Sequence, residues 1–478
     1  MALNKRMKNQ NIVLFTILFT LINLVAKIWN IHEHSLYGDE PFSLFFSQQS
    51  LPELFDRIIN DKNPFLYFMI LHGWIKFYGV TVVNAKLLSA IFSSLAGGLI
   101  FALGTKRFNS NFGLVAAGLF LVSFSQYFYA HEIRAFALVS LLAVLSIFIF
   151  LELIRNPKKW HIPALAFVNL VMILSHYASF LLPIIEFIGT LLFIKQNKKT
   201  FFYFIYSQII AFVFFLPWFL YSTINHVPTA GEFWLAVPTP YRILKVGMNV
   251  VNPVLMAVNL LSFIIIYNPG LRKKTIKKEF DKKIYFFLSL VFWGTLILNF
   301  LVSQKFPILL DRYVLFASIG IFLAISYLFT HLNLSKVTFA TSFIILLGFL
   351  LSVNSYDNQQ ENWPELVNKV KKNKNNNTLV IIHQWWEFRA FSYYYNPDYF
   401  RDYKNTVPKL RNDNIYPIGN ANSIKELIQN NNPEKIIIVM CQSGKKELFF
   451  NLMKKSGYKN KNYYKNRGLS YAIFKKNL

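Results

Sequence analysis

The stretch "NIVLFTILFTLINLVAKIWNIHEHSLYGDEPFSLFF", residues 11–46, predicts the architecture of this chain. Its first part is an apolar run of about 20 residues, long enough to cross a bilayer as a helix. Two adjacent carboxylates, Asp39 and Glu40, follow and precede a second apolar run. The segment 11–31 is too long for a signal-peptide core and lacks a small-residue cleavage site. We therefore expect an uncleaved first membrane span and a cytoplasmic N-terminus.

The composition of the whole chain is that of a membrane protein. Of 478 residues, 54% are hydrophobic and only 15% are charged, a balance typical of polytopic proteins rather than of soluble domains. The net charge of +27 is compatible with nucleic acid, an anionic substrate or lipid head groups. Long apolar runs between the basic clusters favour the membrane, so we expect membrane lipids and no nucleic acid as partners. The single cysteine, Cys441, excludes an internal disulfide and a cysteine-based zinc site.

Eleven apolar segments have lengths close to that of a membrane span. They lie at residues 11–31, 82–103, 112–130, 136–154, 161–177, 178–194, 201–223, 246–267, 284–303, 313–333 and 336–356. A further candidate, 64–80, begins with proline and carries His72 and Lys76. If it does not cross, the basic loops all lie on the side of the N-terminus, as the positive-inside rule requires. We therefore expect 64–80 to be an interfacial amphipathic helix.

The same parity predicts the side on which each remaining loop lies. The loops expected on the outer face are 32–81, 131–134, 224–242 and 303–312. After about residue 357 the chain becomes polar, with strand-like "TLVIIHQW" and "KIIIVMC" and a helix-like "SIKELIQN" between them. We predict a transmembrane module, 1–356, whose first outer loop is 32–81, and a small soluble extracytoplasmic α/β domain, 357–478.

Polar residues in these outer loops form the candidate site. Asp39 and Glu40 begin a predicted helix, "DEPFSLFFSQQ", where carboxylates also complement the helix dipole. Glu132 and Arg134 occupy the turn "HEIR", which an ion pair between them would also stabilise. Position alone leaves both interpretations open for each pair.

Two further residues lie at the ends of apolar segments. His176, in "LSHYASF", is either a packing residue or a functional one. Arg312, in "LLDRYVLF", is either neutralised by Asp311 or free to bind a phosphate through two hydrogen bonds. Together the four elements supply a base, a second acid and a phosphate-binding group on one face. This combination is more informative than any one residue.

In the order of these elements the chain resembles the polytopic GT-C glycosyltransferases, which take sugars from polyprenyl-phosphate donors. They include the protein O-mannosyltransferases and the lipid A aminoarabinose transferases. The resemblance spans roughly residues 10–330 and rests on Asp39-Glu40, "NPFLYF", "SQYFYAHEIRAFAL", "LSHYASF" and "LLDRYVLF". The chain departs from the family pattern at Asn63, where a proline is usual, and at Lys86, where an arginine is usual.

The resemblance implies an inverting transfer of a hexose or pentose at the outer face of the plasma (inner) membrane. The acceptor would be a glycan, a lipid or a protein, and the donor a polyprenyl-phosphate sugar. Asp39 would be the general base, a role worth a factor of about 10²–10⁴ in rate, and Glu40 would orient it. The substrate-binding residues would be Lys86, Glu132, Arg134, His176, Arg312 and Tyr313. No cofactor or resident metal is expected, and a requirement for a divalent cation is left open.

A second class of function is a transporter or flippase for a lipid-linked or anionic substrate, because charges within a membrane also mark substrate pathways. That function predicts charges throughout the spans, on both loop faces, and an inverted repeat. The sequence instead concentrates its acids on one face and has no such repeat, which favours the enzyme. The role of the C-terminal domain is open between acceptor recognition and structural support.

Overall fold

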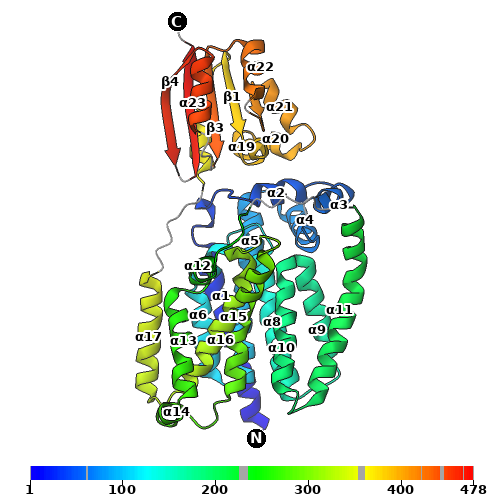
Figure 1. Ribbon diagram of the computed structural model, residues 1–478, viewed down its shortest axis with the longest axis vertical. Coiled ribbons are helices and arrows are strands. Elements are labelled where there is room, and N and C mark those ends of the chain that lie inside the picture. Colours follow the sequence, from blue (N-terminus) through cyan, green and yellow to red (C-terminus); the bar gives the residue numbers. More distant parts are fainter. Residues whose placement is uncertain are drawn as a thin grey trace. The chain divides into compact units, whose positions relative to one another are not determined.

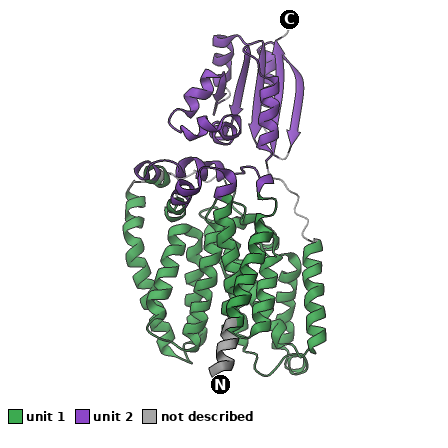
Figure 2. Ribbon diagram, turned by 180° about the vertical axis from the view of Figure 1, so that it is seen from behind, with its two compact units in different colours: residues 1–31, 55–70, 86–356 green, residues 32–54, 71–85, 357–478 purple. Residues whose placement is uncertain are grey.

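The computed structural model describes residues 2–60, 63–225, 235–353, 361–420, 422–441, 446–466 and 468–476. It is mostly helical, with one five-stranded sheet near the C-terminus (Figure 1). Its contacts divide the chain into two compact units (Figure 2). Unit 1 holds residues 1–31, 55–70 and 86–356, and unit 2 holds residues 32–54, 71–85 and 357–478. Residues 226–234 of the predicted outer loop 224–242 lie outside the described residues.

Six helices in the described part of the chain are long and apolar enough to cross a membrane. They are Asn11–Glu33, Val82–Arg107, Phe136–Arg155, Lys198–Ile224, Lys282–Ser303 and Asp311–His331. In each, an apolar run of about 20 residues satisfies all of its backbone groups internally by forming a helix. These helices make the chain an integral membrane protein.

The helices of unit 1 follow the predicted apolar segments closely. They are α1 (Ala2–Ile28), α5 (Val82–Arg107), α6 (Ser110–Leu121), α7 (Phe124–Tyr129), α8 (Phe136–Arg155), α9 (His161–Ser175), η2 (Tyr177–Phe180), α10 (Leu181–Phe193), α11 (Lys198–Asn225), α12 (Pro240–Val250), α13 (Pro253–Tyr267), α14 (Pro269–Thr275), α15 (Lys282–Ser303), η3 (Asp311–Ala317), α16 (Ser318–His331) and α17 (Lys336–Val353). Helix α9 packs against α8 and α11, while α15 packs against α10 and α16. At Gly320 of α16 an added Cβ would lie 2.7 Å from the Leu288 backbone oxygen of α15. Glycine therefore permits the close approach of these two helices.

Two of the predicted spans are not single straight helices. Segment 112–130 is interrupted after α6, where Ser123 caps the short helix α7 by accepting a hydrogen bond from the Gln126 amide. Segment 246–267 contains two helices, α12 and α13, bent by 109° relative to each other. The break is at Asn252, whose φ is +71° and whose side chain caps α13 ahead of Pro253. The pair Asn-Pro was a local signal for this break.

Helix α4 (Leu66–Tyr78) occupies the segment whose crossing was in question. It has 13 residues and is therefore only about 20 Å long at 1.5 Å per residue. The hydrocarbon core is about 30 Å thick, but α6 with 12 residues is no longer than α4, so length alone does not decide whether α4 crosses. Its position at the membrane surface stays a prediction. The helix that precedes it is α3 (Leu51–Asn60).

Unit 2 is built around a mixed sheet with strand order β2-β1-β3-β5-β4. The first strand, β1, runs parallel to its neighbours β2 and β3, whereas β5 is antiparallel to β3 and β4. The strands are β1 (Thr378–His383), β2 (Ile415–Pro417), β3 (Lys435–Cys441), β4 (Tyr458–Asn466) and β5 (Leu469–Lys476). The other elements of the C-terminal segment are α18 (Trp363–Asn373), η4 (Trp385–Glu387), α19 (Phe388–Tyr395), α20 (Pro397–Arg401), α21 (Thr406–Asn412), α22 (Asn422–Asn431) and α23 (Lys446–Lys455).

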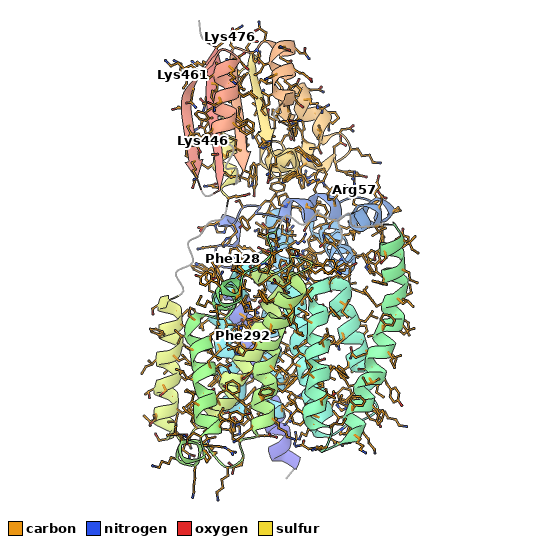
Figure 3. The ribbon with its side chains drawn as sticks, viewed as in Figure 1. Arg57, Phe128, Phe292, Lys446, Lys461 and Lys476 are labelled. Carbon is orange, nitrogen blue, oxygen red and sulfur yellow. The ribbon has the colours of Figure 1, made fainter. Side chains whose placement is uncertain are left out.

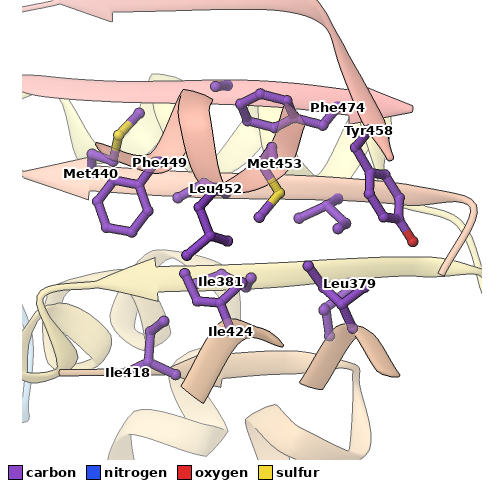
Figure 4. Close-up of a cluster of buried hydrophobic side chains, with 14 residues drawn as sticks. Leu379, Ile381, Ile418, Ile424, Met440, Phe449, Leu452, Met453, Tyr458 and Phe474 are labelled. Carbon is purple, nitrogen blue, oxygen red and sulfur yellow. The ribbon is translucent and has the colours of Figure 1, made fainter. Parts of the chain in front are cut away.

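The burial of each strand explains its sequence. Strands β1 and β3 are continuous apolar runs because both of their faces are covered. Leu379 and Ile381 of β1 join Ile424 of α22 and Phe449 of α23 in one apolar core (Figure 4). Strand β4, "YKNKNYYKN", lies at the edge of the sheet and is polar and largely exposed. The small α/β fold predicted for this segment is confirmed.

Residues 32–54, the beginning of the first loop, belong to the same unit as this sheet. It contains η1 (Ile31–Glu33) and α2 (Glu40–Ser47). The backbone amide of Leu36 donates to the Tyr394 hydroxyl at 2.9 Å, and Gln48 donates to the Phe400 backbone oxygen at 2.8 Å. Contacts therefore hold the loop to the C-terminal segment on both sides of α2.

Candidate functional site

The two adjacent carboxylates form part of a closed turn. Glu40 is 1% exposed, and its Oε2 accepts a hydrogen bond from the Tyr37 amide at 2.7 Å. The Glu40 amide in turn donates to the Tyr37 backbone oxygen at 3.0 Å. Gly38 lies between them at a φ of +54°, a conformation that favours glycine. Glu40 therefore fixes the turn that carries Asp39.

Asp39 is partly exposed and precedes the first residue of α2. Its side chain makes no capping hydrogen bond to this helix. Its place at the start of α2 is the one at which a carboxylate complements the helix dipole, so the structural interpretation given from the sequence stays open. The carboxylate of Asp39 is carried by a turn that is closed by hydrogen bonds between Tyr37 and Glu40.

In unit 1, Lys86 and the "HEIR" turn are connected through α5. Lys86 is 1% exposed, and Ser89 lies one helical turn further on. The Ser89 hydroxyl donates to the Glu132 backbone oxygen at 2.7 Å and lies 3.3 Å from the Tyr67 hydroxyl. Glu132 itself is 6% exposed. The turn that carries Glu132 is thus attached to the helix that carries Lys86.

Arg134 is held by one of the two residues at which the chain departs from the family pattern. Its Nη2 donates to the Asn63 Oδ1 at 3.3 Å, and its guanidinium lies 5.9 Å from the centre of the Phe68 ring. A proline at position 63 would supply no side-chain acceptor. Asn63 therefore positions Arg134 in a way that the sequence comparison did not predict.

His176 joins α9 to η2 and lies in an aromatic environment. Its ring centre is 4.8 Å from that of Tyr313 and 5.4 Å from that of Phe136. Its Nδ1 accepts a hydrogen bond from the Ala178 amide at 3.2 Å. A neutral imidazole that accepts at Nδ1 carries its proton at Nε2, so His176 can donate one hydrogen bond from the other side of the ring.

The second arginine of the site lies beside the same rings. The Arg312 guanidinium is 5.6 Å from the centre of the Tyr313 ring, and its charge, like that of Arg134, acts on His176. We call Arg134, His176, Arg312 and Tyr313 the cationic cluster. Phe128, labelled in Figure 3, packs against the small apolar core beside it. Asp311, the alternative partner considered for Arg312, accepts a hydrogen bond from Asn249 at 2.8 Å.

An apolar groove of about 860 Å³ lies next to the cationic cluster. It is lined by Ile58, Ile59, Asn63, Ile173, Tyr177, Phe180, Pro183, Ile184, Phe187, Phe204, Ile205, Gln208, Ala211, Phe212, Phe215, Phe219, Ser222 and Thr223. Two of these residues connect it to the cluster: Asn63 bonds Arg134, and Tyr177 follows His176 in the chain. Sequence reasoning missed the groove, because its walls come from segments that are distant in the sequence.

The structure brings some of the predicted site residues together and leaves others in separate units. The cationic cluster, Lys86 and Glu132 belong to unit 1, and Asp39 and Glu40 belong to unit 2. Among the described residues, no group of three His, Cys, Asp or Glu side chains is arranged to hold a metal ion.

Two buried charged residues in the helices of unit 1 were not singled out from the sequence. Lys27 of α1 donates to Asn23 at 2.9 Å and lies 4.7 Å from the centre of the Phe120 ring. Glu186 of α10 bonds Ser146 at 2.7 Å and is fully buried. A lone charge inside an apolar run was the available signal for both.

No protein-family model matches the chain, and no curated protein matches it. Two solved structures of ArnT from Cupriavidus metallidurans resemble it. The structure bound to undecaprenyl phosphate has a TM-score of 0.59 at 10% identity and covers 96% of this chain and 98% of that chain. The fold is that of ArnT. The apo form gives a TM-score of 0.58 at 12% identity, covering 96% and 97%. ArnT is a lipid A aminoarabinose transferase, so the predicted resemblance to GT-C glycosyltransferases is confirmed for the fold.

Proposed function

We propose that this chain transfers a sugar from a polyprenyl-phosphate donor to an acceptor at the outer face of the membrane. The observation that supports this most is the apolar groove next to the cationic cluster: Asn63, which lines the groove, bonds Arg134, and Tyr177, which also lines it, follows His176 in the chain. Such a site is complementary to a ligand with a long apolar chain and an anionic head group. One of the ArnT structures with this fold was solved with undecaprenyl phosphate bound.

In the proposed reaction the cationic cluster binds the phosphate of the donor. The bond between the anomeric carbon and the phosphate oxygen breaks, and its electron pair moves to the phosphate. The growing negative charge is stabilised by the guanidinium groups of Arg134 and Arg312 and by the Nε2 proton of His176. Lys86, Glu132 and Tyr313 complete the proposed substrate-binding set.

On the opposite side of the sugar, the acceptor forms the new bond. Asp39 removes the proton of the acceptor group as its oxygen or nitrogen attacks the anomeric carbon, which inverts the configuration at this carbon. Glu40 holds the turn in place through its hydrogen bonds with Tyr37. The reaction as written requires no cofactor, because the arginines compensate the charge of the leaving phosphate.

We also propose eleven crossings of the inner membrane, with the N-terminus in the cytoplasm. The six long helices, the bent pair α12–α13 and the four shorter apolar helices together make eleven. The shorter ones are Ser110–Leu121, His161–Ser175, Tyr177–Phe193 and Lys336–Ser352. This number places the basic loops inside and the C-terminal region outside.

A flippase for a lipid-linked substrate is the second candidate function. Lys27 and Glu186 favour it, because buried charges within apolar helices are typical of transport pathways. Both functions share the lipid-binding groove. They differ in chemistry, because only the transferase releases polyprenyl phosphate.

The experiment that separates them uses the full-length protein in liposomes with undecaprenyl-phosphate sugars. We expect acceptor-dependent release of undecaprenyl phosphate with at least one sugar, and the same rate with excess EDTA. Transbilayer movement of the donor without release would contradict the transferase. Arg155→Ala, which changes an exposed arginine at the end of α8, is the control for loss of positive charge.

A further inference from the structure

The C-terminal segment of unit 2 encloses one arginine in aromatic rings that come from two parts of the chain. The Arg389 guanidinium lies 4.9 Å from the Phe46 ring centre and 5.6 Å from that of Phe42, both in α2. It lies 5.5 Å and 5.3 Å from the ring centres of Trp385 and Phe388, which precede it in its own segment. Cation–π contacts on both sides make Arg389 a link between α2 and the C-terminal segment.

Other contacts attach α2 to the same segment. The Phe45 ring of α2 meets Phe388 and Phe400 edge to face, at centre distances of 5.6 Å and 5.3 Å. Hydrogen bonds from Leu36 and Gln48 to this segment flank the helix. The turn that carries Asp39 therefore lies between two attachment points, and α2 is the element that connects it to Arg389.

Charge also connects Asp39 to this segment. Glu387, two residues before Arg389, is close enough to Asp39 for the negative charge of Asp39 to help keep the Glu387 carboxyl protonated. The positive charge of Arg389 acts on the same Glu387 carboxyl in the opposite sense and lowers its pKa. The surroundings of Asp39 thus include residues far from it in the sequence.

We propose that Arg389 is a positioning residue for Asp39: the C-terminal domain sets the orientation of the base through α2. This inference rests on the proposed function, because it takes Asp39 as the base. It assigns a role to the C-terminal domain, for which acceptor recognition and structural support were both open. Arg389 acts through α2 and makes no contact with the reacting atoms in this proposal.

The test compares variants of the full-length protein. Arg389→Ala should lower kcat for transfer about tenfold or more and leave undecaprenyl-phosphate binding unchanged, because the cationic cluster and the groove belong to unit 1. Backbone amides of residues 36–48 should exchange hydrogen faster in Arg389→Ala than in the wild-type protein. Arg389→Lys, which keeps a cation among the rings, should restore part of both losses. The matched control is Arg401→Ala, an arginine of the same segment paired with Asp398, which should leave both measurements unchanged.

A second variant keeps the proposal testable if Arg389→Ala folds poorly. Phe46→Leu removes the nearest ring and leaves α2 apolar, and it should lower kcat in the same direction. The double variant Phe46→Leu/Arg389→Lys should lose less kcat than the product of the two single fold-losses, because both changes weaken the same contact.

Wild-type kcat and exchange in both Arg389→Ala and Phe46→Leu would overturn the proposal. Equal losses of kcat and of donor binding, together with a lower melting temperature, would also overturn it and leave Arg389 a stability residue. Absence of transfer by the wild-type protein with every donor would instead refute the proposed function. The exchange measurement would still decide whether Arg389 holds α2.

Discussion

At the scale of single residues, Asp39 gives the sharpest test of the mechanism. Asp39→Asn keeps the turn, because the hydrogen bonds of the turn join Tyr37 and Glu40. A helix-dipole role would be worth only about 0.3–1 kcal/mol. A general base predicts instead a loss of about 10²-fold or more in turnover, with donor binding retained. Purified Asp39→Asn and Glu40→Gln proteins are compared with wild type, and we expect Glu40→Gln to be intermediate. Full turnover by Asp39→Asn would refute the mechanism.

Arg312 gives a second test, because the two interpretations of this residue predict different losses. If it binds the donor phosphate, Arg312→Ala should raise KM for the donor and lower kcat, since charge grows on the phosphate in the transition state. Arg312→Lys should recover only part of the activity, because an ammonium group lacks the two-pronged geometry. Arg155→Ala serves as the control. Unchanged kinetics in Arg312→Ala would leave the residue a structural role.

The pKa of Glu387 allows a prediction of how the stability of the C-terminal domain depends on pH. Burial first, and then the negative charges of Glu361 and Asp39, raise the pKa of Glu387 to about 8 from its usual 4.5, and Arg389 opposes the shift. The folded state therefore binds this proton more tightly than the unfolded state, so stability should fall as pH rises from about 5 to about 8, by at most about 1.4 kcal/mol per pH unit.

The measurement is thermal unfolding of the C-terminal domain, in the full-length protein, between pH 5 and 8. Glu387→Gln cannot lose a proton and should flatten the profile. Glu434→Gln, a change at an acid elsewhere in the same domain, should not. A profile of Glu387→Gln identical to that of wild type would mean that Glu387 does not hold its proton in the folded protein.

At the scale of elements, a prediction concerns α11, because residues of this helix line the groove. Ala211 is buried and lines the groove, whereas Val213, two residues further on, is 56% exposed. Ala211→Trp should narrow the groove and raise KM for a donor with a long polyprenyl chain about tenfold. Val213→Trp places the same side chain at a position that does not line the groove and should change little. Equal KM values for the two variants would show that the long chain binds elsewhere.

The elements also show how far the sequence could be read. Hydrophobic runs predicted the helices of unit 1, because an apolar segment in a membrane has almost no alternative to a helix. The bend at Asn252 was missed, since the apolar run continues through it. The bond between Asn63 and Arg134 spans 71 positions, and only the tertiary fold brings the two residues together. The motifs named the four residues of the cationic cluster as candidates. The groove beside them became visible only in the fold.

At the scale of the whole molecule, two statements about the chain depend on different kinds of evidence. The fold follows from the likeness to ArnT over nearly the full length of both chains. The proposed orientation in the membrane rests on charge alone, since basic loops resist translocation. The proposed chemistry at the outer face requires both, because the groove proposed for the donor and the acidic turn must be reached from the same side.

The orientation can be measured by labelling cysteines in intact cells. The native Cys441 is buried in β3, and Cys441→Ser gives a background without thiols, because the chain contains one cysteine. In this background Ser423→Cys should react with a membrane-impermeant maleimide from outside, because an odd number of crossings puts residues 357–478 opposite the N-terminus. Lys158→Cys, in the basic loop after α8, should react only after the membrane is opened. The reverse pattern would place the acidic turn and its donor in the cytoplasm, and a transferase at the outer face would then be refuted even if every substituted residue proved essential.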